Sequence, residues 1–96
     1  MPKAYWIFNA TITDPDTYRK YVERDGEAFA KYGARFLVRG GDAVVVEGSA
    51  RARHVIIEFE NLAVARACYD SPEYQAASVF RRAGAVTDLI IVEGVT

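Results

Sequence analysis

Five polar side chains in otherwise apolar segments are the residues of this sequence that could carry out chemistry: Asn9, Asp25, His54, Tyr74 and Arg81. A carboxylate or an imidazole can exchange a proton, whereas an amide, a phenol or a guanidinium can bind and orient a polar group. We therefore predict Asp25 and His54 as candidate catalytic residues, and Asn9, Tyr74 and Arg81 as candidate binding residues. If the protein is an enzyme, Asp25 and at least two of the others should line one enclosed cavity.

Asp25 stands out because it interrupts an apolar stripe. Aromatic and aliphatic residues recur every three to four positions after Tyr18, and Asp25 lies on the same side of the predicted helix. A buried carboxylate is costly unless it is paired, and Arg35 or Arg39 could be its partner. In a cavity between helix and sheet, its affinity for a proton would rise. Alternatively, Gly26 distorts the helix and Asp25 escapes to solvent.

His54 and Asn9 are each open to two interpretations. His54 is the single histidine, and it could act as a general base or simply lie at the surface or at a dimer interface. One histidine cannot build the usual zinc site, and Cys68 lies on a separate predicted helix, so no metal and no cofactor are predicted. Asn9 could orient a ligand carbonyl or bind the backbone of a loop.

Tyr74 and Arg81 lie seven residues apart, hence on one side of a helix that starts at Ser71. Ser71 and the proline after it suit the start of a helix, which favours a capping role for this serine over a nucleophilic one. Tyr74 and Arg81 could line the edge of a pocket, or they could be a partly buried tyrosine beside a solvated arginine. The helix also carries an apolar stripe, predicted to face the core: Ala76, Val79, Phe80 and Ala83.

The elements that must position these residues follow from hydrophobic period and turn signals. Strands are predicted at 3–12, 53–60 and 87–94, with two further β runs around a glycine turn within 34–48; helices are predicted at 13–33, 61–70 and 71–85. The order βαββαβ, with the second helix broken in two, is the ferredoxin-like plan: an α+β fold whose antiparallel sheet has helices on one face. Both faces of strand 3–12 are apolar, so we expect a second copy of the chain to cover the open sheet face in a homodimer.

Length and charge limit the function further. The 96 residues form one predicted domain, 1–96, with twelve basic and thirteen acidic residues and a net charge of −1. No basic field is present to attract nucleic acid or an anionic membrane. A single cysteine excludes an internal disulfide, and no signal-peptide pattern or apolar run of about 20 residues occurs, so a cytoplasmic location is expected.

Four ordered motifs resemble one family. The stretches YWIFNATITDPDTY, YGARFLVRGG, VVEGSARARHVIIEF and YDSPEYQ are similar to those of the family called domain of unknown function 1330, within the dimeric α+β barrel superfamily. The resemblance covers nearly the whole chain and implies a ferredoxin-like fold and a barrel formed by two chains. It implies no settled activity, although the wider superfamily includes monooxygenases, isomerases and haem-degrading enzymes that place ligands between helices and sheet.

We therefore expect a small homodimeric α+β barrel protein that takes a small organic molecule. One hypothesis is a metal-independent enzyme acting by proton transfer or cofactor-independent oxidation. The alternative is a non-catalytic binding module or a structural dimerisation module.

Overall fold

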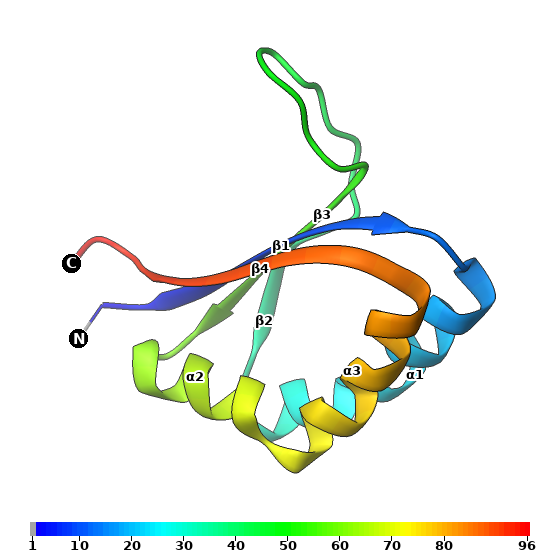
Figure 1. The fold of residues 1–96 in the computed structure, drawn as a ribbon. Coiled ribbons are helices and arrows are strands. Elements are labelled where there is room, and N and C mark those ends of the chain that lie inside the picture. The colour runs from blue at the N-terminus through cyan, green and yellow to red at the C-terminus, as the bar shows by residue number, and fades with distance from the viewer. Residues whose placement is uncertain (1) are drawn as a thin grey trace.

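The chain folds into a four-stranded antiparallel sheet whose one face is covered by helices, as the sequence predicted (Figure 1). The computed structural model describes residues 2–96. Along the chain the elements are β1 (Ala4–Ile12), α1 (Pro15–Lys31), β2 (Arg35–Arg39), β3 (Arg53–Phe59), α2 (Leu62–Asp70), α3 (Pro72–Gly84) and β4 (Ala85–Glu93). The strand order is β2-β3-β1-β4, so β1 lies in the interior of the sheet and β4 forms one edge. Within residues 2–96, no helix is long and apolar enough to cross a membrane.

Each of the three helices begins at a side chain that caps it. The side chain of Asp14 accepts from the Thr17 amide at 3.2 Å, and the Asn61 side chain accepts from the Val64 amide at 2.9 Å. Ser71 ends α2 and begins α3, and its hydroxyl oxygen accepts from the Tyr74 amide at 3.1 Å. These bonds satisfy amide groups that a helix start would leave without partners. The serine is therefore a cap, which confirms that interpretation.

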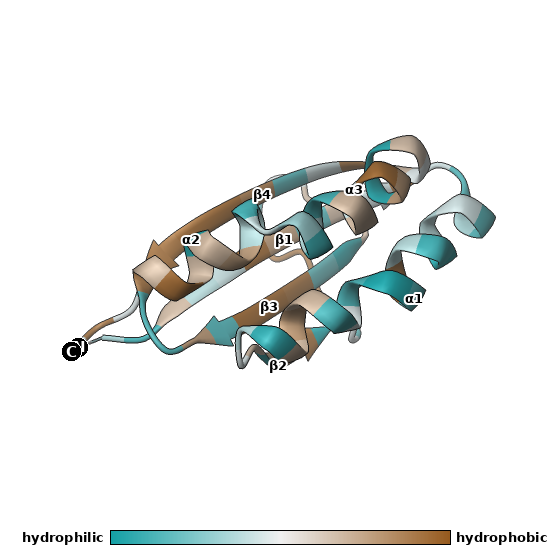
Figure 2. Ribbon diagram, turned by 90° about the horizontal axis from the view of Figure 1, so that it is seen from below, coloured by the Kyte–Doolittle hydropathy of each residue, from teal (hydrophilic) through white to brown (hydrophobic). Residues whose placement is uncertain are grey.

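The inner face of the sheet, turned toward the helices, holds the core. Trp6 and Phe8 of β1 pack there with Ile57 of β3, and all three are at most 3 % exposed. Seen from the helix side, α1 runs along the β2–β3 half and the α2–α3 pair along the β1–β4 half (Figure 2). α3 and α1 approach each other closely at Gly84, the last residue of α3, where an added Cβ would lie 2.7 Å from the Tyr18 amide nitrogen of α1. This approach fixes where α1 starts over the sheet.

The outer face of the sheet has no covering layer among residues 2–96. Ile90 is 58 % exposed, Val86 50 % and Val92 43 %, and the register places Ile7 of β1 between Ile90 and the half-buried Ile56. An apolar outer face is what the sequence predicted.

The predicted second β run after the glycine turn is wrong. The segment 40–52 is a loop that rises on the side of the sheet away from the helices (Figure 1). Val44 and Val46 are 86 % and 87 % exposed. Valine favours strands only where neighbouring side chains pack against it, and beyond the sheet this segment meets no such surface.

The apolar stripe predicted to face the core on α3 does so only at Phe80, which is half-buried and packs against the core. Val79 is 58 % exposed, and Ala76 and Ala83 are exposed as well. The buried side of α3 is the more polar one: Tyr74, Ala77, Ser78, Arg81 and Gly84. Close packing of α3 against α1 at Gly84 requires small residues on the buried side of the helix. The pattern of apolar residues therefore predicted the opposite side of α3 as the buried one.

Candidate functional site

A narrow cavity between α1 and the sheet contains Asp25. Its walls are aromatic and aliphatic, and its polar groups come from α1 and from the facing ends of β2 and β3. The polar residues that line it are Tyr18, Tyr21, Asp25, Arg39 and Arg53. The cavity has about 20 Å³ of free space, which is room for about one water molecule.

Asp25 carries a buried carboxyl oxygen that has no direct partner among the described residues. Asp25 is 5 % exposed, and its Oδ1 has no hydrogen-bond partner among the described residues. Burial raises the pKa of this carboxyl group from 3.8 to about 6, although the positive charges of Arg39 and Arg53 oppose the rise. A carboxylate of this kind is unusually ready to hold a proton. The prediction that Asp25 lies in a helix–sheet cavity is confirmed, and the alternative, escape to solvent beside Gly26, is wrong.

Two arginines lie across the cavity from α1. The Arg39 guanidinium lies 4.1 Å from the centre of the Phe36 ring, and the Arg53 guanidinium lies 5.9 Å from the centre of the Tyr18 ring. Neither forms an ion pair with Asp25 among the described residues, and Nε of Arg53 is buried without a partner. The cavity thus combines a proton-exchanging acid with two positive charges that lie near it but are not neutralised by direct contact.

Two tyrosine hydroxyl groups form a contact between this cavity and the core: Tyr21 lines the cavity, and Tyr74 is buried in the core. The hydroxyl oxygens of Tyr21 and Tyr74 lie 3.0 Å apart, and Tyr21 is one turn before Asp25 on α1. Burial raises the pKa of both phenols, well above 10 for Tyr21. Both hydroxyls are therefore neutral at physiological pH and serve as hydrogen-bonding groups.

The five sequence-predicted residues do not share one cavity. Asn9 and His54 lie side by side on the outer face of the sheet, where Asn9 Oδ1 and His54 Nδ1 are 2.7 Å apart. Tyr74 is completely buried in the core, next to Tyr21 rather than in the Asp25 cavity. Arg81 lines a different cavity, beside β4. The expected convergence is thus wrong, because side chains on opposite faces of a sheet cannot meet; the individual roles stay predictions.

The α3 residues follow one of the two interpretations only in part. Arg81 lines a pocket, as the first interpretation predicted, and the alternative of a solvated arginine is wrong, because Arg81 is 5 % exposed and its Nη1 donates to Thr87 Oγ1. Tyr74 is 0 % exposed rather than partly buried.

Sequence reasoning missed Tyr18, Tyr21 and Arg53 as site residues. The sequence contained a signal for each of them. The two tyrosines lie on the same helix stripe as Asp25, and Arg53, two residues before Val55, lies with it on the inner face of β3. Arg39 had been named as a possible partner of Asp25, whereas Arg35 is exposed and paired in register with Glu58. Among residues 2–96, no group of three His, Cys, Asp or Glu side chains is placed to hold a metal ion.

Comparison with known proteins gives one family and a set of similar folds. Residues 3–95 match the family described as Domain of unknown function (DUF1330). No curated protein matches the chain. The structure is similar to that of the methylated RPA0582 protein, with a TM-score of 0.77, 19% identity, and coverage of 99% of this chain and 82% of that one; RPA0582 is a protein of unknown function from Rhodopseudomonas palustris.

Two other solved structures share the fold at lower identity. SnoaB, a cofactor-independent oxygenase from Streptomyces nogalater, has a TM-score of 0.66 and 10% identity, covering 100% of this chain and 96% of its own. A dimeric protein of unknown function with a ferredoxin-like fold, from Bacteroides fragilis, has a TM-score of 0.64 and 14% identity, covering 96% of each chain. At such identities the likeness concerns the fold.

Proposed function

The chain belongs to the DUF1330 family, and from that premise we propose that it binds a small organic molecule between α1 and the sheet and exchanges a proton with it through Asp25. The observation that carries this proposal is the buried, unpartnered carboxyl group whose pKa is raised to about 6. A structural carboxylate would be expected to have a direct partner, because leaving one buried and unpaired costs stability.

The chemistry follows from the charges around the carboxyl group. Near neutral pH most of the Asp25 carboxyl group is ionised, so it can act as a general base toward a weakly acidic C–H or O–H group. The electron pair left on the substrate would be delocalised onto an oxygen, and the positive charges of Arg39 and Arg53 would stabilise that oxygen. This step needs a substrate in which the acidic hydrogen lies next to a carbonyl or belongs to a phenol.

Entry of such a molecule requires the cavity to widen. Arg39 is exposed and Arg53 half-buried, and both lie where the 40–52 loop joins the sheet. Long arginine side chains can change rotamer at modest cost, so we infer that these two form the mouth and move when a ligand enters. SnoaB, a cofactor-independent oxygenase, shares this fold, which makes chemistry without a cofactor compatible with the architecture.

Deuterium exchange tests the proposal. In D2O, 2,4-pentanedione loses its acidic C–H signal in proton NMR, and wild-type protein should accelerate that loss. The catalysed rate should rise with pH as the Asp25 carboxyl group, with a pKa of about 6, ionises. Asp25→Asn should reduce the catalysed rate by about 100-fold or more, the usual contribution of a general base. Asp16→Asn, an exposed change on the same helix, is the matched control and should keep the rate. If Asp25→Asn and wild type exchange the probe equally fast, Asp25 is not the base.

A second candidate function, dimerisation, is favoured by the exposed apolar outer face. We propose that two copies of the chain pack their sheets face to face through Ile90 and its neighbours, which would remove this face from water. Sedimentation at micromolar concentration should then give about twice the chain mass of 10.7 kDa.

Two matched variants decide whether the sheet face forms that contact. Ile90 and Val79 are both 58 % exposed, but Val79 lies on α3 on the other side of the molecule. Ile90→Asp should give monomers, because a charge would be buried in the interface, whereas Val79→Asp should leave the dimer intact. A wild-type monomer, or equal behaviour of the two variants, contradicts the proposed dimer.

A further inference from the structure

A second cavity lies between the α2–α3 pair and the edge strand β4, apart from the Asp25 cavity. It is an open cleft of about 670 Å³. Its lining combines three arginines with an aromatic and aliphatic wall: Arg66, Arg81, Arg82, Tyr69, Leu89 and Ile91. No aspartate or glutamate is among the lining residues. The cleft is therefore positive on one side and apolar on the other.

Arg81 is the unusual member of this lining. It is 5 % exposed and enters no ion pair among the described residues. Its Nη1 donates to Thr87 Oγ1, and its Nε is buried without a partner. A nearby phenol, Tyr74, stays neutral and gives the guanidinium no counter-charge. A guanidinium buried with no anion is costly, so an anionic group in the cleft would relieve a real penalty.

The other two arginines are already engaged at the rim. Arg66 Nε lies 3.1 Å from a carboxylate oxygen of Asp70, and Arg82 Nη2 donates to Gln75 Oε1 at 3.2 Å. Both side chains are exposed, so water weakens their attraction for a ligand. Arg81 alone combines burial, positive charge and free hydrogen-bonding capacity.

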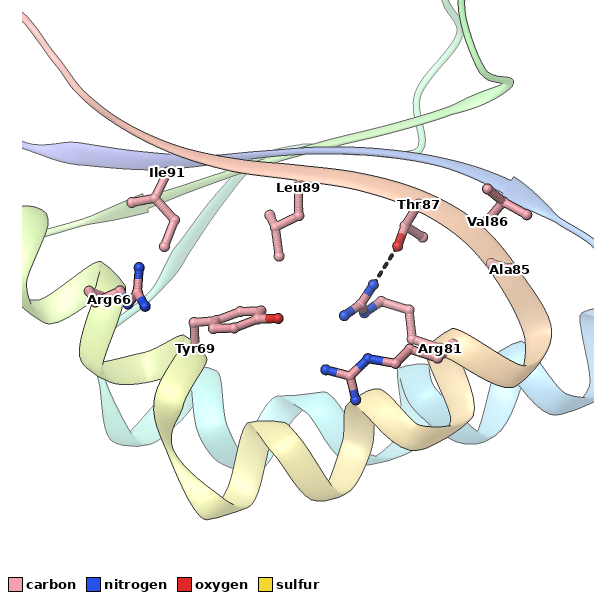
Figure 3. Close-up of a pocket in the computed structure, with 9 residues that line it drawn as sticks. Arg66, Tyr69, Arg81, Ala85, Val86, Thr87, Leu89 and Ile91 are labelled. Atoms are coloured by element: carbon pink, nitrogen blue, oxygen red, sulfur yellow. Dashed lines mark hydrogen bonds between the residues drawn. The ribbon is translucent and has the colours of Figure 1, made fainter.

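The apolar wall indicates what else the ligand must carry. Tyr69 extends its ring into the cleft with the hydroxyl group directed toward Arg81, while Leu89 and Ile91 approach from β4 on the opposite side (Figure 3). An aromatic or aliphatic body could lie between ring and strand with its charged end at Arg81. Bare phosphate would leave this wall unused.

We propose that the cleft binds a small organic carboxylate, with its carboxylate on Arg81 and its apolar body between Tyr69 and the Leu89–Ile91 wall. The planar guanidinium matches a carboxylate in shape and can donate two parallel hydrogen bonds to it. This cleft and the Asp25 cavity share no lining residue, so the proposal does not depend on the one made for Asp25.

Benzoate, its neutral analogue benzamide and inorganic phosphate test this site by NMR of the Leu89 and Ile91 methyl groups. Benzoate should shift both signals with saturation, and benzamide should bind about 10-fold more weakly or worse, since a hydrogen bond to a charged group is lost. Arg81→Gln should weaken benzoate binding by at least about 10-fold, whereas Arg82→Gln should change it by less than about 3-fold. Asp25→Asn should leave it unaltered.

Two controls keep the outcome decisive. Arg81→Lys retains the charge without the planar pair of donors and should also weaken benzoate about 10-fold, which supplies a result if Arg81→Gln does not fold. The comparison of benzoate with benzamide needs no variant at all. Equal affinity for these two compounds, full benzoate binding without Arg81, or phosphate binding as tightly as benzoate would each overturn the proposal.

Discussion

The two faces of the sheet differ strongly in solvent exposure, although both carry apolar residues. Neighbouring residues of β1 show this: Trp6 is 0 % exposed, and its indole nitrogen donates to the Ala65 carbonyl oxygen at 3.0 Å, whereas Ile7 remains half-buried on the outer face. Both residues are apolar. Within the part of the chain that the structure describes, only the inner face has a helical layer to cover it.

The polar groups of the two faces differ in the opposite way. On the outer face Asn9 and His54 satisfy each other, and water can reach them. Inside, Asp25 and Arg81 are each about 95 % buried and each has an atom without a partner. Burial without pairing is what makes a charge reactive or ready to bind. The comparison therefore directs the search for function to the inner side.

The largest difference between the faces should appear when one large side chain is removed from each. Trp6→Ala should lower the free energy of unfolding by about 3–5 kcal/mol, because it leaves a cavity in the core. Ile90→Ala should cost less than about 1 kcal/mol at protein concentrations where the chain is a monomer. Urea denaturation at several protein concentrations measures both. Equal losses in dilute protein would contradict the assigned faces.

A smaller effect should follow from neutralising the buried acid. The folded state holds the Asp25 proton up to pH about 6, whereas the unfolded chain releases it near 3.8. Between these values the folded protein binds more protons, so its free energy of unfolding falls as pH rises. Relative to Asp25→Asn, wild type should lose about 2–3 kcal/mol between pH 4 and pH 7. The free energy of unfolding of Asp16→Asn should follow that of wild type across this pH range. If the difference between wild type and Asp25→Asn does not change with pH, the Asp25 carboxylate is solvated.

The smallest effect compares one hydroxyl inside with one amide outside. Tyr74→Phe should lower the free energy of unfolding by about 1–2 kcal/mol, because it leaves the Tyr21 hydroxyl buried without its partner. Asn9→Ala removes the bond to His54 but lets water replace it, so about 0.5 kcal/mol is expected. Thermal unfolding in dilute protein separates the two. A larger loss for Asn9→Ala would indicate that the outer face is closed to water.

Local signals predicted much of this molecule correctly. The capping residue Ser71 marked the start of α3, and the spacing of the α1 stripe placed Asp25 against the sheet. These predictions succeed because each depends on residues within a few positions along the chain.

Three predictions that depended on distant contacts failed. The buried side of α3 contains Ser78 and Arg81 because the close approach to α1 at Gly84 selects that side. Val44 and its neighbours have strand-forming side chains but no surface to pack on. His54 and Asp25 were grouped by chemistry, and the sheet separates them.

By itself, the sequence determined the order of elements, the helix boundaries and the position of one carboxylate on an apolar stripe, because hydrophobic period and capping act within a single segment. Only the tertiary structure decided which charges lose water and which partners they lack. Desolvation depends on every layer that packs around a group, and for Asp25 and Arg81 those layers come from segments far apart in the chain.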